Sequence, residues 1–299
     1  MALRVAQELR DRLSPPPPDI PVLPGTATSW AVDDEEPSLA HPVSQLCTQR
    51  QFEEPEFAEW CGQMRRAPTS HRKLWEFAYI LQVLRQHGML QAGRKGLGFG
   101  TGKEPLSAVM ARHGVSVLAT DLDPARAEAR DWSGTDQHAK ALSDMNPGGI
   151  CDPERFSELV SLEFADMNAI PPRYQGFDFC WSACAFEHLG SINAGLDFVE
   201  NSLRCLRPGG IAVHTTEYNC SSARRTVGHG PTVLFRMQDI LRLGERLRAR
   251  GHEVRFNFHQ GTGEMDRYVD VPPYTSDVHL KLRLMRYVTT SIGLAVRKK

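Results

Sequence analysis

The sequence predicts an α/β protein whose mostly parallel β-sheet is covered by helices on both faces. Two observations lead to this fold class. Between residues 95 and 296, short apolar runs alternate with stretches of helical periodicity, which is the pattern of strands joined by crossover helices. A glycine-rich turn follows the first of these runs, and an acidic residue ends the second. The 299 residues are enough for one large domain with additions.

Composition argues against several other classes of protein. Hydrophobic residues make up 41% and charged residues 24% of the chain, as in a globular protein. Acidic and basic residues number 36 and 35, so charge supports neither a nucleic-acid nor a membrane partner. No apolar run approaches the roughly 18 residues that cross a bilayer, and no signal-peptide pattern begins the chain, so we expect a cytoplasmic location. Seven scattered cysteines without a C-x-x-C pair predict reduced thiols.

The pattern divides the chain into three parts. Residues 1–45 are rich in proline and acid, which predicts a poorly ordered or extended arm. In residues 46–92, apolar side chains recur at intervals of three and four, so we expect a helical extension of two helices. Residues 93–299 form the main domain.

Seven strands and three further helices are expected in the main domain. The strands are at 95–99, 115–120, 162–165, 177–182, 211–216, 254–258 and 287–296. The helices are at 106–113, 194–206 and 237–250, and the last two end at glycine or proline stop signals.

The turn between the first strand and the next helix carries glycines at alternate positions, Gly98, Gly100 and Gly102. Such a turn lets the backbone approach a ligand closely. No register satisfies the dinucleotide pattern G-x-G-x-x-G, and Glu104 replaces the serine or threonine of a phosphate-binding loop. The spacing therefore favours a ligand without phosphate.

Asp121 ends the second strand, 19 positions beyond Gly102. A carboxylate at this place accepts hydrogen bonds from both hydroxyls of a ribose. This residue indicates a nucleoside and does not choose between NAD and S-adenosylmethionine (SAM).

With these motifs in order, residues 93 to about 218 resemble the Rossmann-like class I SAM-dependent methyltransferases, with a core like methyltransferase type 11. The most specific segment is Leu206-Arg207-Pro208-Gly209-Gly210 before an apolar strand. The resemblance implies that SAM is the methyl donor and S-adenosylhomocysteine the product. It assigns these cofactor contacts: Gly98, Gly100, Gly102, Asp121, Leu122, Asp166, Met167, Ser182 and, for the methionine carboxylate, Arg72. For Arg72 and Lys73, a solvated helix face is the alternative. The resemblance also implies that residues 46–92 serve as a lid over the cofactor or substrate.

One position departs from the family pattern. The family has an acidic residue two positions before the first glycine of the turn, where this chain has Gly96. We take Glu104, just beyond the turn, as the candidate substitute.

Candidate catalytic residues follow the fourth and fifth strands. His188 is the leading base, because histidine titrates near neutral pH, with a structural or SAM-shielding histidine as the alternative. Glu217 follows the fifth strand, where the family often positions its acceptor, and Asn219 lies beside it. We interpret His214, earlier in that strand, as a buried core histidine.

We expect no metal site, because His188, His214, Glu217 and His279 are far apart and lack ligand spacings. Three segments are candidates for the acceptor pocket: 132–149, which contains Gln137 and His138, 270–274 and 279–281.

The sequence therefore predicts a methyltransferase that acts, most plausibly on oxygen, on a small molecule or glycan in a biosynthetic pathway. The tetrapeptide N/D-P-P-Y/F of amino methylation is missing from the fourth strand end. Two alternatives stay open: a SAM-binding protein that transfers the aminocarboxypropyl group or is non-catalytic, and, disfavoured by the glycine spacing, an NAD-dependent oxidoreductase. The oligomeric state is left open.

Overall fold

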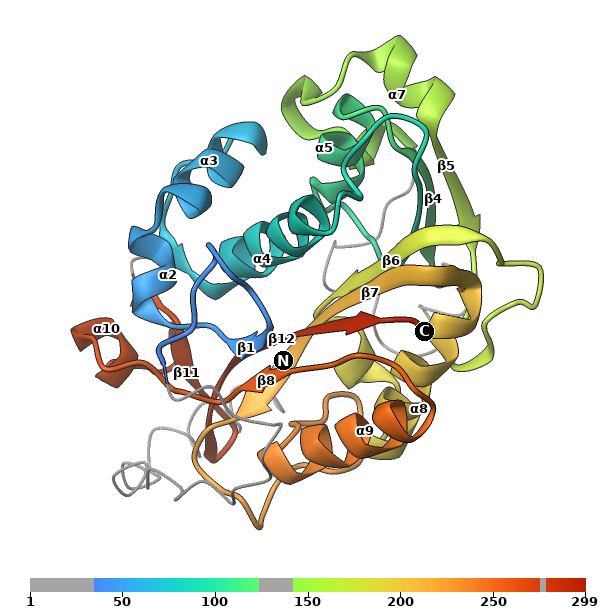
Figure 1. The fold of residues 1–299 in the computed structure, drawn as a ribbon. Helices are drawn as coiled ribbons and strands as arrows, with labels where there is room; N and C mark the ends of the chain where they lie inside the picture. The colour runs from blue at the N-terminus through green and yellow to red at the C-terminus, as the bar shows by residue number, and fades with distance from the viewer. Residues whose placement is uncertain (1–34, 124–141, 275–277) are drawn as a thin grey trace.

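The structure, a computed structural model, describes residues 35–123, 142–274 and 278–299 (Figure 1). Within these residues the main sheet has ten strands. Eight follow the order β5-β4-β3-β6-β7-β12-β1-β8, while β11 pairs with β12 and β9. A second sheet joins β10 to β2. The predicted α/β class with a mostly parallel sheet is confirmed.

All seven expected strands are present in the main sheet. They are β3 (Lys95–Phe99), β4 (Ser116–Asp121), β5 (Val160–Phe164), β6 (Phe177–Ala183), β7 (Leu206–Asn219), β8 (Phe256–Asn257) and β12 (Tyr287–Arg297). The first five are parallel to their neighbours, and β12 runs antiparallel to β7. The carboxyl ends of β3, β4, β5, β6 and β7 therefore meet at one edge of the sheet, and this edge positions the site.

The expected number of seven strands is too low, because five short strands carry no apolar run that would signal them. They are β1 (Ser44–Leu46), β2 (Ser70–His71), β9 (Val269–Asp270), β10 (Val278–His279) and β11 (Lys281–Leu284). β1 shows the reason best. Its backbone pairs with β12 on one side and with β8 on the other, so its polar residues are ordered by the neighbours.

Helices cover both faces of the sheet. They are α2 (Gln49–Glu53), α3 (Pro55–Gln63), α4 (Arg72–Gln86), α5 (Leu106–Arg112), α7 (Pro153–Leu159), α8 (Ile192–Ser202), α9 (Met237–Ala249) and α10 (Glu264–Arg267). Figure 1 shows α3, α4, α5 and α7 on one side of the sheet and α8 and α9 on the other. Strand residues alternate between the two cores: Phe179 and Trp181 face the α4 side, and Cys180 faces the α8 side.

Helix α4 belongs to the main core. Its residues from Trp75 to Leu84 are buried without interruption, and Trp75 stacks on Tyr79 with ring centroids 5.1 Å apart. The Tyr79 ring packs against Gly293 of β12, where a Cβ would lie 2.2 Å from a ring carbon. The segment 46–92 is thus fixed to the sheet by packing, and a role as a lid stays a prediction.

The expected arm reaches into the core as well. Leu39 is fully buried, and Ser44 and Gln45 belong to β1. Sheet pairing and apolar contacts order residues 35–45, and the description of residues 1–45 as an arm stays a prediction. Residues 1–34, like Gln137 and His138, lie outside the described part of the chain.

Across the three described stretches, no helix is both long and apolar enough to pass through a membrane.

The contact between Tyr79 and Gly293 gives a test of the packing of α4 on the sheet. We expect Gly293→Ala to destabilise the protein by about 1–3 kcal/mol, because the buried ring must move away from the new methyl group. The control is Gly62→Ala in α3, where nothing lies within 4 Å of a new Cβ, and which should be neutral or stabilising by up to about 1 kcal/mol. Urea unfolding measures both; equal midpoints would contradict the packing.

Candidate functional site

The glycine turn is shaped by two residues in the left-handed region. Gly100 has φ +60° and Gly102 has φ +48°, conformations in which a side chain is strained. The turn is anchored to the end of β4, because the Thr101 N–H donates to the Thr120 carbonyl oxygen at 3.1 Å. The Gly102 N–H donates to Oδ2 of Asp121 at 3.2 Å. The structure thus brings together the turn and the acid that the sequence singled out separately.

Packing on β3 explains why the family's acid is missing. Gly96 pairs with Phe179 of β6, and Gly98 pairs with Trp181. A Cβ at Gly96 would lie 2.5 Å from the Phe179 ring, and one at Gly98 would lie 2.6 Å from the Trp181 ring. Two large rings fill the space above the glycines, so no acidic side chain fits at position 96.

Glu104 lies beside the same ring. Its Oε1 accepts a hydrogen bond from Nε1 of Trp181 at 2.6 Å, and the side chain is buried. Burial raises the pKa of Glu104 to about 8, against the opposing effects of the indole hydrogen bond and of Lys73. The expected substitute acid is therefore next to the turn, and it carries a proton at neutral pH.

Three further expected cofactor residues surround the turn. The Leu122 N–H donates to Oδ1 of Asp121 at 2.8 Å. After β5, Asp166 accepts from the Asn168 N–H at 2.9 Å and caps the short helix Met167–Ala169. The Met167 sulfur would lie 3.4 Å from a Cβ at Gly100. These residues therefore meet at one edge, as parallel strands require.

Ser182 faces away from this group. Its hydroxyl is fully buried and lies 2.8 Å from Nδ1 of His214, whose Nε2 lies 3.1 Å from Oγ of Ser202. Burial lowers the pKa of His214 to about 3, so the ring is neutral and holds β6, β7 and α8 together. The interpretation of His214 as a core histidine is confirmed, and a cofactor contact through the Ser182 side chain conflicts with this burial.

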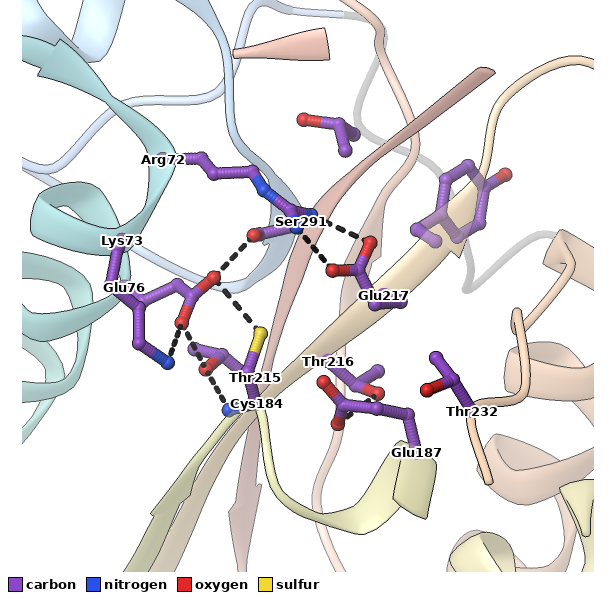
Figure 2. Close-up of polar contacts among 12 residues, drawn as sticks. Arg72, Lys73, Glu76, Cys184, Glu187, Thr215, Thr216, Glu217, Thr232 and Ser291 are labelled. Carbon is purple, nitrogen blue, oxygen red and sulfur yellow. Dashed lines mark hydrogen bonds and ion pairs between the residues drawn. The ribbon is translucent and has the colours of Figure 1, made fainter. Parts of the chain in front are cut away.

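Arg72 and Glu217, expected at the donor and the acceptor, bind each other (Figure 2). Nη1 of Arg72 lies 2.6 Å from Oε2 of Glu217, and Nη2 bonds the second carboxylate oxygen. The side chains are 13% and 8% exposed. This two-pronged pair joins the first residue of α4 to the end of β7.

A second ion pair lies beside the first, and the sequence analysis missed it. Nζ of Lys73 lies 3.1 Å from Oε2 of Glu76 and donates to the Ala183 carbonyl oxygen at 3.1 Å. Oε1 of Glu76 accepts from Sγ of Cys184 at 3.0 Å and from Oγ of Ser291. Burial alone would raise the pKa of Glu76, but Lys73 and Arg72 lower it. The H-R-K-x-x-E sequence was a signal for this pair, since residues three apart in a helix are neighbours.

Cys184 lies directly after β6 in the left-handed region, with φ +49°. This conformation costs about 1–2 kcal/mol for a residue with a Cβ. Its N–H donates to the carbonyl oxygen of Thr215 at 3.0 Å and lies 3.1 Å from the Thr215 hydroxyl, which hold the backbone in place. Burial, together with the Glu187 and Glu76 carboxyls, raises the pKa of the Cys184 thiol, so it is protonated.

His188 and Glu187 follow in the next turn. Nδ1 of His188 lies 2.8 Å from the Pro231 carbonyl oxygen. Because a carbonyl only accepts, Nδ1 carries the proton in the neutral ring and the lone pair is on Nε2. Glu187 is buried and accepts from the Thr216 hydroxyl at 3.0 Å. Burial raises the pKa of Glu187 despite the nearby His188.

Among the described residues, Cys184, Glu187 and Glu217 bring possible metal-ligand atoms within 4.8 Å of one another. Cys184 and Glu187 are three residues apart, but Glu217 follows 30 residues later in β7, so spacing along the chain did not signal this group. A cation would have to compete here with the Arg72 guanidinium for Glu217. The expectation of no metal stays a prediction.

The C-terminal segments expected near the acceptor lie beside the start of α4. Nδ1 of His279 is 2.6 Å from Oδ2 of Asp270, and its ring stacks on His71 with centroids 4.6 Å apart. Burial and the neighbouring His279 lower the pKa of His71 to about 4, and its Nδ1 accepts from the Lys73 N–H. Tyr274 packs edge-on against His279.

A family model described as a methyltransferase domain matches residues 97–214. These residues run from β3 into β7 and contain the glycine turn, Asp121 and His188. The match identifies them as a class I methyltransferase domain, whose methyl donor is SAM. The resemblance seen in the sequence and the expected cofactor are thereby confirmed. No curated protein matches the chain.

Several solved structures are similar to parts of this chain. YjhP of E. coli is 18% identical over 56% of this chain and 57% of that chain, with a TM-score of 0.35. Phosphoethanolamine N-methyltransferase 2 of Haemonchus contortus is 17% identical over 56% of this chain and 35% of that chain, with a TM-score of 0.36. A SAM-dependent methyltransferase of Mesorhizobium loti is 17% identical over 72% of this chain and 95% of that chain, with a TM-score of 0.43. This chain covers 57% of the length of YjhP and 35% of the length of the Haemonchus contortus enzyme.

The protonated state of Glu104 gives a test by pH. The folded protein holds this proton up to about pH 8, whereas the reference carboxyl loses it near 4.5. Wild-type stability therefore falls as pH rises through that window. Glu104→Gln has no proton to lose, so we expect its stability relative to wild type to increase from pH 5 to pH 8.

Urea midpoints at several pH values measure this difference. The control is Glu158→Gln, which changes an exposed carboxyl of α7 and should show little trend. A stability difference between wild type and Glu104→Gln that is constant from pH 5 to pH 8 would contradict the assigned proton.

Proposed function

We propose that this protein is a SAM-dependent methyltransferase that methylates a hydroxyl group of a small molecule or glycan in a biosynthetic pathway. One observation carries the proposal. The backbone of the glycine turn and the Asp121 carboxylate are in contact, at 3.2 Å, at the carboxyl edge of a parallel sheet within a methyltransferase domain. Ligands of open α/β sheets bind at this edge.

The residues at the turn fit the donor. Glycine at these positions lets the backbone of the turn approach a ligand closely, which suits the amino-acid part of SAM. Asp121, fixed by Gly102 and Leu122, has the position and charge to accept from the ribose hydroxyls. Leu122, Asp166 and Met167 are our candidates for contact with adenine. When bound, SAM supplies a methyl group on a sulfonium, which is reactive enough to need no further activation.

The acceptor side belongs, in our proposal, to the ends of β6 and β7. A hydroxyl acceptor must lose a proton during transfer, and Nε2 of His188 has the lone pair to take it. Glu217 is the second candidate, as a hydrogen-bond acceptor that aligns the hydroxyl. Neutral overall charge, with 36 acidic and 35 basic residues, supports a small acceptor over nucleic acid or a membrane surface.

A product analysis tests the reaction itself. The protein is incubated with SAM and a panel of phenols, sugars and amines, and the masses of the products are measured by mass spectrometry. We expect an acceptor that gains the mass of one methylene and an equal amount of S-adenosylhomocysteine. Release of methylthioadenosine would indicate aminocarboxypropyl transfer, and stabilisation against heat by NAD alone would favour an oxidoreductase; either result refutes the proposal.

Asp121 gives a prediction that needs no acceptor. We expect Asp121→Asn to weaken the binding of S-adenosylhomocysteine by roughly 10- to 100-fold, because hydrogen bonds to a charged group are lost. Isothermal titration calorimetry measures the affinity. Asp197→Asn, which changes an exposed acid of α8, serves as the control, and unchanged affinity in Asp121→Asn would remove Asp121 from the donor site.

A further inference from the structure

The ion pair between Arg72 and Glu217 joins two residues that were assigned separately to the donor and the acceptor. The guanidinium uses two nitrogens to bind both oxygens of the carboxylate (Figure 2). With side chains 13% and 8% exposed, neither group has water as its main partner. In this state both oxygens of the Glu217 carboxylate are bound to Arg72, so Glu217 does not interact with an acceptor.

The chemistry of the pair allows exchange for an external carboxylate. The planar fork of a guanidinium binds any carboxylate in the same two-pronged way. The amino-acid part of SAM ends in that same group. Removing one partner from a buried pair leaves an uncompensated charge, which is strongly unfavourable. Replacing one carboxylate by another avoids this cost, so Arg72 can change partners without being left alone.

Arg72 and the glycine turn are connected through the residues that follow β6. Arg72 binds Glu217, whose carboxylate lies within 4.8 Å of the Cys184 thiol. The next residue, Ala185, has its Cβ only 2.9 Å from where a Cβ at Gly100 would be. A short path through the end of β6 therefore links the turn to Arg72. The neighbouring Lys73 amino group, bound to the Ala183 carbonyl, lies along the same path.

We propose that Arg72 exchanges partners: Glu217 holds the guanidinium in the ligand-free protein, and the carboxylate of SAM takes it in the complex. This inference rests on the proposed function. The exchange releases the Glu217 carboxylate beside Cys184 and Glu187, whose polar atoms lie within 4.8 Å. Glu217 then aligns the acceptor hydroxyl only after the donor is bound. The ion pair thus sets an order of binding, donor before acceptor.

The test compares two ligands that differ in the carboxylate. S-adenosylhomocysteine carries the amino-acid part, and methylthioadenosine lacks it. We expect Glu217→Gln to tighten S-adenosylhomocysteine binding by roughly five- to tenfold, because the internal competitor for Arg72 is weakened. Binding of methylthioadenosine should not change. Glu245→Gln, at an exposed position of α9, is the matched control, and calorimetry measures each dissociation constant.

Arg72→Gln, alone and combined with Glu217→Gln, completes a double-mutant cycle. It should weaken S-adenosylhomocysteine binding, and Glu217→Gln should give no gain in the Arg72→Gln background. Thermal unfolding checks that each variant is folded; Glu217→Asp, whose shorter side chain reaches Arg72 less well, replaces Glu217→Gln if that variant is not.

Three outcomes overturn the exchange: unchanged affinity in Glu217→Gln, weaker affinity, or equal tightening of methylthioadenosine. If S-adenosylhomocysteine binds wild type but Glu217→Gln changes nothing, the exchange fails while the proposed function stands. A wild-type protein that binds neither SAM nor S-adenosylhomocysteine refutes the proposed function itself.

Discussion

Compensation of buried charge at the carboxyl ends of β6 and β7 is the interaction on which the site depends. Arg72 and Lys73 stand side by side in the first turn of α4, opposite the carboxylates of Glu217 and Glu76. The carboxylates of Glu217 and Glu76 are buried. A buried charge without a partner is costly, so both carboxylates need the helix to begin where it does. His71 fixes that start, because Nδ1 of its ring accepts a hydrogen bond from the Lys73 N–H in the first turn of the helix. The residue at which α4 begins and the ion pairs at the strand ends therefore depend on each other.

A second constraint comes from packing around the glycine turn. The rings of Phe179 and Trp181 occupy the space over β3, and only glycine at positions 96 and 98 accommodates them. Glu104, which we propose as the substitute for the acid usually found there, accepts a hydrogen bond from the Trp181 indole. Burial keeps that carboxyl protonated at neutral pH. The turn thus keeps its backbone shape while the charge next to it differs from the family pattern.

Much of this arrangement could be predicted from the sequence, and the reasons for the rest are physical. Parallel strands bring their carboxyl ends together, so the proximity of the glycine turn to Asp121 followed from the strand order. The bond between Glu76 and Ser291 spans 215 residues and has no local signal. Short polar strands such as β1 form only because their neighbours offer backbone partners.

The position of the Ser182 side chain follows from the alternation of side chains along β6. Side chains alternate along a strand, so Ser182 must share a face with Cys180 and lie opposite Trp181. That alternation places its hydroxyl against His214 in the core. By contrast, the pairing of Arg72 with Glu217 joins a helix to a strand 145 residues later, and only the folded chain reveals it.

We propose that the glycine turn and Asp121 form the donor site. A crystal structure of the protein with S-adenosylhomocysteine is the decisive test. We expect the amino-acid part of the ligand to lie along Gly98 to Gly102 and both ribose hydroxyls to donate to Asp121. A ligand bound elsewhere, or a ribose that makes no contact with Asp121, would contradict it.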